Sequence, residues 1–342
     1  MAAGKSPARL EGVEESMKAI VRDRYGSPEV LRLAEVAKSV PEDDQVLVRV
    51  RAASVNTADL DQLKGFPPIS RLGTGVLRPR NKTLGLDVAG QVEAIGPNVT
   101  RFHPGDEVWA DLFAFGQGGF AEYVCAPQRA FTPMPVGLSF AQAATVPHSG
   151  VLALQGLLGK GEIKPGDKVL INGAGGCVGP FAVQIAKSFE AEVTGVDHTG
   201  KLELLTTVGA DHVIDYTRED FTETARRYDL ILDIAAQRSL LRYRRSLNPR
   251  GRYVVVAHSL AGFLQAMLVG AWISMTVSKK MGIFTWSPNR REDLDLLGRL
   301  LETGGLEPVI DRHYRLSEVP AALHYVATGR ARGKVVITMG DS

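Results

Sequence analysis

The chain has 342 residues, about twice a common domain size, so two lobes with separate cores are expected. Its 40 Lys and Arg stand against 38 Asp and Glu, and this near balance excludes the strong basic field of a nucleic-acid-binding protein and favours a small-molecule partner. The cysteines, Cys125 and Cys177, are too few for a disulfide framework or a four-cysteine zinc lobe and fit a reducing, cytoplasmic location.

The first part of the chain predicts a flexible extension followed by a β-rich lobe. Residues 1–16 are polar and charged and lack the apolar core of a secretory signal. Residues 17–136 contain short β-branched runs separated by turns, and the clearest runs alternate with the period of two that strands show. The expected strands include residues 45–51, 87–95, 107–110 and 120–124. A glycine-rich loop is expected to join the last two of them.

The middle of the chain, residues 137–286, predicts a doubly wound parallel sheet. Ser139 is suited to cap a helix over residues 141–144, and a second apolar helix is expected over 151–158. Short strands and helices then alternate, and such βαβ units force parallel strands and right-handed crossovers. The expected strands are 168–172, 192–196, 212–214, 230–233 and 253–256, and the expected helices are 178–188, 202–208 and 240–246.

The end of the chain, residues 287–342, is expected to return to the first lobe and complete it. It predicts helices over 292–302 and 319–328 and a closing strand over 334–337.

Residues 259–278 carry no formal charge and are long enough by count to cross a membrane. Glycine and polar residues interrupt the stretch, which also lies where the nucleotide lobe should lead back to the barrel. We therefore predict a buried or cleft-covering helix and no stable membrane insertion.

A glycine loop between a strand and a helix predicts a dinucleotide site. The strand 169–171 leads into the loop, and a helix starts at Pro180, so backbone amides at the helix start can hold a pyrophosphate. The predicted NAD or NADP contacts in this loop are Gly173, Gly175, Gly176, Cys177, Val178 and Gly179. The alternative is a tight turn with a close packing contact. Cys177 is expected to pack as a small side chain, although a helix N-terminus can also activate a thiol.

Asp197 ends the next strand, eighteen residues past Gly179. A carboxylate there can accept hydrogen bonds from ribose hydroxyls and would repel a 2′-phosphate, which favours NAD. His198, Thr199 and Lys201 follow, and they could bind that phosphate if the Asp197 carboxylate turns away. A plain helix-capping role for Asp197 also stays open.

Several motifs resemble the medium-chain dehydrogenase/reductase superfamily, in its zinc-independent, quinone oxidoreductase-like branch with the reticulon-4-interacting members. The resemblance spans residues 17 to 339. It is carried by residues 52–59, 85–90, 104–108, 118–123, 172–179, 209–216 and 332–337.

The resemblance implies an α/β fold with a GroES-like β-barrel lobe, residues 17–136 completed by 287–342, around a Rossmann lobe of residues 137–286. It further implies hydride transfer from a nicotinamide dinucleotide to quinones, enones or enals, and a homodimer formed through the Rossmann sheet. Tyr216 and Lys334 become candidate cofactor contacts, with surface or packing roles as the alternative.

Zinc-dependent members of the superfamily place a Cys, a His-Glu pair and a second Cys around the metal. At these positions this sequence has Asn56, Leu86-Asp87 and, nearby, His148. An amide, a carboxylate and an imidazole make a poor zinc set, so we predict no zinc. Without a Lewis acid a conjugated acceptor is easier to reduce than a plain carbonyl, since hydrogen-bond donors suffice for the charge that spreads onto its oxygen.

The predicted catalytic residues are Asn56, Asp87 and His148. The Asn56 amide could donate to the acceptor oxygen or to the nicotinamide ribose, or it could merely satisfy a loop backbone. His148 is a candidate proton donor, because imidazole titrates near neutral pH, or a solvated loop residue. Two rival functions stay open: a zinc-free alcohol or aldehyde dehydrogenase, and a dinucleotide-binding interaction protein without turnover. The apolar residues 281–286 could wall the substrate site or simply fill the core.

Overall fold

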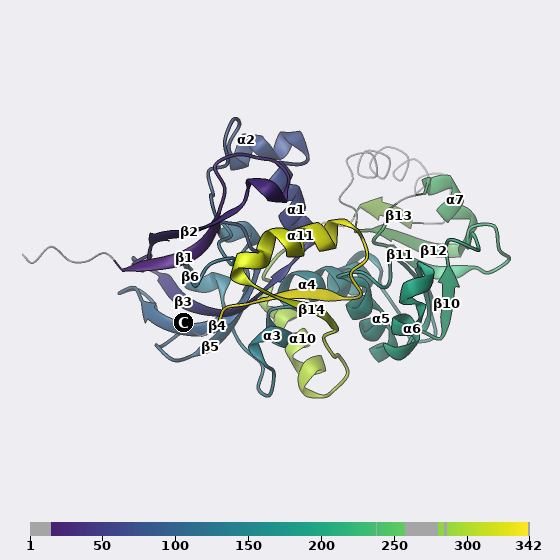
Figure 1. Ribbon diagram of the computed structural model, residues 1–342. Helices are drawn as coiled ribbons and strands as arrows, with labels where there is room; N and C mark the ends of the chain where they lie inside the picture. The colour runs from purple at the N-terminus through teal and green to yellow at the C-terminus, as the bar shows by residue number, and fades with distance from the viewer. Residues whose placement is uncertain (1–14, 237, 257–279, 284–285, 341–342) are drawn as a thin grey trace, which may run out of the picture.

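The computed structural model describes residues 15–236, 238–256, 280–283 and 286–340. Figure 1 shows two lobes: strands from both ends of the chain build one, and the middle of the chain builds the other. The predicted stretch 259–278 lies outside the described residues, as do residues 1–14 of the predicted extension.

The barrel lobe is built on a seven-stranded sheet with the order β14-β15-β3-β4-β5-β7, in which β6 also pairs with β3. Its strands are β3 (Gln45–Val55), β4 (Asp87–Ile95), β5 (Glu107–Asp111), β6 (Tyr123–Pro127), β7 (Thr132–Pro133), β14 (Ile310–Arg315) and β15 (Lys334–Thr338). A separate antiparallel pair consists of β1 (Ser16–Val21) and β2 (Arg32–Ala37). Val48 and Val50 on β3 pack with Val88 on β4 and Leu323 in one buried core.

Short helices close this lobe. They are η1 (Pro28–Val30), α1 (Thr57–Lys64), η2 (Pro68–Ser70), α2 (Arg71–Thr74), η3 (Phe113–Phe115), η4 (Gln128–Ala130), η8 (Leu316–Glu318) and α11 (Val319–Ala327). Asn56 caps α1 in a box with Asp59, and Gly65 ends the helix at a left-handed φ of 63°. The side chain of Asn56 is thereby fixed where β3 ends and α1 begins.

The second lobe holds a six-stranded sheet in which every pair is parallel, with the order β10-β9-β8-β11-β12-β13. The strands are β8 (Lys168–Asn172), β9 (Glu192–Asp197), β10 (His212–Asp215), β11 (Tyr228–Asp233), β12 (Leu247–Val255) and β13 (Lys280–Ile283). The winding direction reverses between β8 and β11. In such sheets ligands bind beyond the carboxyl ends of the strands at that reversal, which is where the glycine loop leaves β8.

The remaining helices are α3 (Phe140–Ala143), α4 (Pro147–Gln155) with a π-turn η5 (Gly156–Lys160), α5 (Gly179–Ser188), η6 (Thr199–Lys201), α6 (Leu202–Thr207), α7 (Leu240–Arg245) and α10 (Arg291–Glu302). Helix α4 packs against α5 and α10 and also contacts β5 of the barrel lobe. It therefore lies at the junction of the lobes.

Three sequence expectations differ from the structure. The strand expected over 120–124 begins at Tyr123 and pairs with β3, whereas β5 pairs with β4. The helix expected over 151–158 begins at Pro147, whose fixed φ suits a first helical turn. His148 is consequently a buried helical residue and not a solvated loop residue. The first strand also starts at Ser16, inside the expected extension.

Across the described residues, no helix combines the length and the hydropathy needed to traverse a bilayer.

Candidate active site

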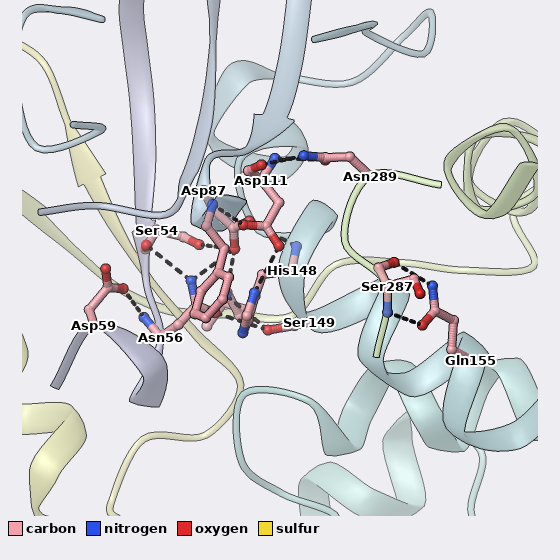
Figure 2. A network of polar contacts seen from close by, with 12 residues as sticks. Ser54, Asn56, Asp59, Asp87, Asp111, His148, Ser149, Gln155, Ser287 and Asn289 are labelled. Atoms are coloured by element: carbon pink, nitrogen blue, oxygen red, sulfur yellow. Dashed lines mark hydrogen bonds and ion pairs between the residues drawn. The ribbon is translucent and has the colours of Figure 1, made fainter. Parts of the chain in front are cut away.

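Four buried polar side chains form a closed network where the lobes meet (Figure 2). The Lys334 ammonium donates to Asn56 Oδ1 at 2.6 Å, to Ser149 Oγ at 3.0 Å and to Asp87 Oδ2 at 3.2 Å. Asn56 Nδ2 donates to Asp87 Oδ2 at 3.0 Å, and Ser149 Oγ donates to Asn56 Oδ1 at 3.2 Å. Lys334 and Asp87 are both 0% exposed, so this ion pair is sealed from water.

The network leaves Asn56 and Asp87 little capacity for an acceptor. Both ends of the Asn56 amide are bonded within the protein. Asp87 Oδ2 also accepts from Ser54, and Asp87 Oδ1 accepts from the backbone amide of His148 at 2.8 Å. Asp87 thus stands at the N-terminus of α4, where its charge is stabilised by the helix dipole. Burial raises the pKa of Asp87, and the Lys334 charge opposes that rise.

His148 contributes a ring nitrogen that has no partner among the residues that the structure describes. Its Nδ1 lies 2.9 Å from Asp111 Oδ2, and both side chains are buried, with 4% and 1% exposed. An ionised carboxylate only accepts hydrogen bonds, so the Nδ1 proton is fixed toward Asp111. Among the described residues, Nε2 has no protein partner. Burial is the largest single influence and lowers the pKa of His148, but the charge and hydrogen bond of Asp111 together with the Asp87 charge outweigh it, so the pKa is raised.

Asp111 is the functional candidate that the sequence did not reveal. Its second oxygen accepts from the Phe113 amide at 2.9 Å, and its backbone pairs in both directions with the Asn289 side chain. The partner histidine is 37 positions away and on another element, so no local spacing links the two. The one available signal was a carboxylate at the buried end of a strand, β5.

An aromatic wall covers His148. The Trp286 ring meets the imidazole edge-on with centroids 4.9 Å apart, and Phe113 lies 4.9 Å from Trp286. Gln155 holds the neighbouring backbone by accepting from the Ser287 amide and donating to its carbonyl. The buried Trp286 indole N–H has no acceptor in the described part of the chain. Of the segment 281–286, residues 284–285 lie outside the described residues.

The donor set does not fit a catalytic zinc. Asn56, Asp87 and His148 are held by one another and by Lys334 and Asp111, and Leu86 is an apolar residue with 0% exposure. Within the described ranges there is no group of three or more His, Cys, Asp or Glu side chains arranged to hold a metal. A zinc ion at this place would have to displace the Lys334 ammonium and accept the Asn56 amide as a ligand. Zinc sites in proteins use Cys, His, Asp and Glu instead, so binding here is unfavourable.

The glycine loop has the shape that a diphosphate requires. Gly173 adopts a φ of +83°, and a Cβ at Gly176 would meet nothing nearer than the Gly173 carbonyl at 3.6 Å, so this face of the loop is open. A Cβ at Gly179 would lie 2.1 Å from the Ala174 carbonyl, which shows how closely α5 packs on the loop. Among the described residues, the amides of Cys177, Val178 and Gly179 have no protein acceptor. They are the donors of a helix N-terminus.

Cys177 packs against the barrel core, and burial raises the pKa of its thiol. A raised pKa opposes thiolate formation, which agrees with the expected packing role.

Asp197 faces the loop. Its Oδ2 accepts from the Gly175 amide at 2.8 Å, its Oδ1 accepts from the His198 amide at 2.8 Å, and the Lys201 ammonium lies 3.8 Å from Oδ1. The Gly175 amide is therefore already bonded, as are the amides of Gly173, which donates to the Val196 carbonyl, and of Gly176, which donates to the Gly173 carbonyl.

Beside this carboxylate lies a pocket of about 800 Å³ that both lobes line. Its charged residues are Asp197, Lys201, Asp311, Arg312, Arg330 and Arg332, and Tyr216 and His198 also line it. The predicted residues 197, 198, 201 and 216 are thus brought together, whereas Lys334 lies in the buried network instead.

Two family descriptions match the chain: "Alcohol dehydrogenase GroES-like domain" over residues 42–136 and "Zinc-binding dehydrogenase" over residues 208–337. The mouse (Mus musculus) protein "NAD(P)H oxidoreductase RTN4IP1, mitochondrial" is 31% identical over 353 residues, which cover 94% of this chain and 89% of that relative. The chain belongs to the medium-chain dehydrogenase/reductase superfamily, in its quinone oxidoreductase-like branch.

Other relatives of this oxidoreductase agree. The "2-methylene-furan-3-one reductase" of Solanum lycopersicum is 33% identical over 338 residues, covering 95% of this chain and 80% of the relative. The solved structure of the quinone oxidoreductase from Coxiella burnetii is 30% identical, with a TM-score of 0.85, and the match covers 95% of this chain and 100% of that one. The predicted family and the predicted α/β fold, a GroES-like lobe with a Rossmann lobe, are confirmed.

Proposed function

We propose that this oxidoreductase transfers hydride from NADPH or NADH to quinones or α,β-unsaturated carbonyls, without zinc, and that His148 supplies the accompanying proton. The observation that carries the proposal is the Asp111–His148 pair, buried at the lobe junction with no partner for Nε2 among the described residues. The relatives support the substrate class, because their names include quinone oxidoreductases and an enone reductase.

The cofactor would be held at two places. The open face of Gly176 and the amides at the start of α5 fit the diphosphate, and the pocket beside Asp197 fits the adenosine end. When bound, the nicotinamide supplies two electrons together with one hydrogen. Everything else must come from the residues at the junction.

His148 can complete the reduction by protonating the acceptor. Addition of hydride to a quinone or enone leaves a negative charge on the carbonyl oxygen, and one proton makes the product neutral. His148 Nε2 donates that proton, and the Nε2 proton is later regained from water. The Trp286 ring packs edge-on against the imidazole and helps to keep the ring in place. Asp111 is a positioning residue, since it fixes the ring and favours the imidazolium.

Asn56, Asp87 and Lys334 position this donor. The Asp87 carboxylate holds the amide of His148, and Lys334 with Asn56 holds Asp87. Three carboxyl groups, Asp87, Asp111 and Asp59, surround His148 and Lys334, so a positive charge on His148 is offset within the buried cluster. A charge that is offset by its neighbours costs less to bury than an unpaired one, so the same contacts that fix the ring also favour its protonated form.

We further propose that NADPH is preferred over NADH, although both bind. The Asp197 carboxylate is engaged by two backbone amides and lies near Lys201, so it is poorly placed to repel a 2′-phosphate. Four Lys or Arg and two Asp line the adenosine pocket. One of those carboxylates, Asp311, already accepts from Tyr325 and from the Arg332 amide. The excess positive charge suits a phosphate.

The test is an acceptor panel with both reduced dinucleotides. A quinone, an enal and a saturated aldehyde of similar size are compared, with His148→Gln in parallel. The proposal expects turnover of the quinone or enal, little of the saturated aldehyde, and a large loss in His148→Gln. Equal turnover of the saturated aldehyde would instead support an aldehyde dehydrogenase, and dinucleotide binding without any turnover would support an interaction protein.

The remaining predictions concern assembly and location. A homodimer through the six-stranded sheet is proposed on the family resemblance, and β13 stands at one end of that sheet. The cytoplasmic location stays a prediction, and relatives include proteins named as mitochondrial and chloroplastic.

A further inference from the structure

An acid-free stretch of the barrel lobe combines positive charge with exposed aliphatic side chains. Between Asp61 and Asp87 the sequence contains no Asp or Glu. The same stretch contains five basic residues: Lys64, Arg71, Arg78, Arg80 and Lys82. The surface formed by residues 64–82 is called here the basic-aliphatic surface.

Four large aliphatic side chains on this surface stand in water. Ile69 is 70% exposed, Leu72 is 70% exposed, Val76 is 62% exposed and Leu77 is 89% exposed. Ile69 and Leu72 are three residues apart across η2 and α2, a spacing that places side chains on one side of a helical turn. Grouped exposed apolar side chains mark interaction sites, whereas isolated ones do not.

The surface is a folded feature with its own anchors. The Tyr25 hydroxyl donates to the Gly75 carbonyl at 2.7 Å, and Arg71 donates to the Lys64 and Gly65 carbonyls while its guanidinium covers the Tyr25 ring. Figure 1 shows α2 at the outer margin of the barrel lobe, away from the six-stranded sheet. Its aliphatic side chains are therefore exposed on a stable support.

We propose that the basic-aliphatic surface is a peripheral docking site for an anionic lipid bilayer. Aliphatic side chains can enter the headgroup boundary while the surrounding Lys and Arg attract lipid phosphates. A second copy of the chain is a poor occupant, because a symmetric contact would bring two like-charged surfaces together. Such binding needs no membrane-spanning helix. The docking proposal goes beyond the proposed reaction and does not depend on it.

The test is co-sedimentation of the full chain with vesicles. Phosphatidylcholine vesicles are compared with vesicles in which about 30% of the lipid is phosphatidylglycerol, at low and at raised salt. We expect binding to the anionic vesicles that salt weakens, and at least tenfold weaker binding to the neutral vesicles. Wild-type protein that ignores both vesicles, or binds both equally, overturns the proposal.

Variants assign the binding to the surface. Ile69→Ser, Leu72→Ser and Leu77→Ser together are expected to weaken binding at least tenfold. Lys64→Gln with Arg78→Gln, which removes two of the five basic residues, is expected to reduce its salt dependence. The matched control is Val40→Ser with Val136→Ser, at positions 80% and 87% exposed outside the surface, and it should bind like wild type. Unchanged binding of the triple variant, or a dimer that this variant dissociates, overturns the assignment. Reductase activity on a water-soluble quinone should be equal in all variants.

Discussion

Replacing Asp111 by Asn tests how the proton donor is tuned. The groups facing His148 are Asp111 from β5, Asp87 from β4, Lys334 from β15 and Asp59 from α1. Asp59 is itself buried, which raises its pKa to about 7, so it contributes only part of a negative charge near neutral pH. Asp111 is the one in direct contact with the ring, at 2.9 Å. Its removal takes away the carboxylate nearest the imidazolium and leaves Asp87 and Lys334, whose opposite charges offset each other.

The magnitude follows from charge and distance. Two unit charges about 4 Å apart interact by roughly 4 kcal/mol at an effective dielectric constant near 20, which corresponds to about 3 pKa units as an upper bound. Relaxation reduces this, so we expect the His148 pKa to fall by about 1–3 units in Asp111→Asn. An asparagine has only one acceptor oxygen, so it can accept a hydrogen bond from His148 or from the Phe113 amide, but not from both.

The assay is the pH dependence of kcat/KM with a water-soluble quinone. Protonated His148 is the donor, so the rate should fall as pH rises through its raised pKa. In Asp111→Asn this limb should move to lower pH by about 1–3 units. Asn289→Ala is the control, because it removes backbone bonds to Asp111 and leaves the charge in place. An unmoved limb in Asp111→Asn, or the same limb surviving in His148→Gln, would refute the reasoning.

Three further predictions concern the cofactor and the fold. Gly176→Val should weaken dinucleotide binding about tenfold or more at an unchanged melting temperature, whereas Gly179→Ala should lower the melting temperature, because only the Cβ at position 179 would meet backbone, at 2.1 Å. Calorimetry combined with a binding titration distinguishes the two effects. An equal loss of melting temperature in both variants would count against an open face at Gly176. Arg332→Ala should reduce the ratio of kcat/KM for NADPH to kcat/KM for NADH severalfold, and an unchanged ratio contradicts the proposed phosphate pocket. Asp197→Ala should lower thermal stability more than it changes that ratio, since the Asp197 carboxylate holds the glycine loop. Lys334→Met should cost about 3–5 kcal/mol in the free energy of unfolding by denaturant, because it leaves Asp87 buried without its cation, and a loss below about 1 kcal/mol would show that Asp87 is neutral.

Local patterns were enough to predict five of the six parallel strands of the second lobe, and β13 (Lys280–Ile283) was not predicted. The predicted strands follow from strand and helix alternation, and the glycine loop lies directly after β8 as expected. Pattern reasoning was weaker where helices are short or strands are charged. Helix α1 was not predicted, although Asn56 and Asp59 form a recognisable capping box, and β14 was not predicted because Ile310–Arg315 is mostly polar.

The site was predictable only as a set of positions. Motif comparison pointed to Asn56, Asp87 and His148, which the structure does bring into one network. It could not show that Asn56 and Asp87 are saturated by Lys334 and Ser149, since those residues arrive from distant elements. Asp111 escaped for the same reason: its meaning depends on a contact between β5 and α4 that exists only after both lobes are packed.

The most direct test of the account is rapid mixing of the enzyme and NADPH with a quinone, after extensive treatment with a zinc chelator, while dinucleotide oxidation and proton uptake are followed together. The account predicts full oxidation with one proton taken up per quinone reduced, and a much slower reaction in His148→Gln at unchanged dinucleotide affinity. Loss of the reaction on chelation, or an equal rate in His148→Gln, would contradict it.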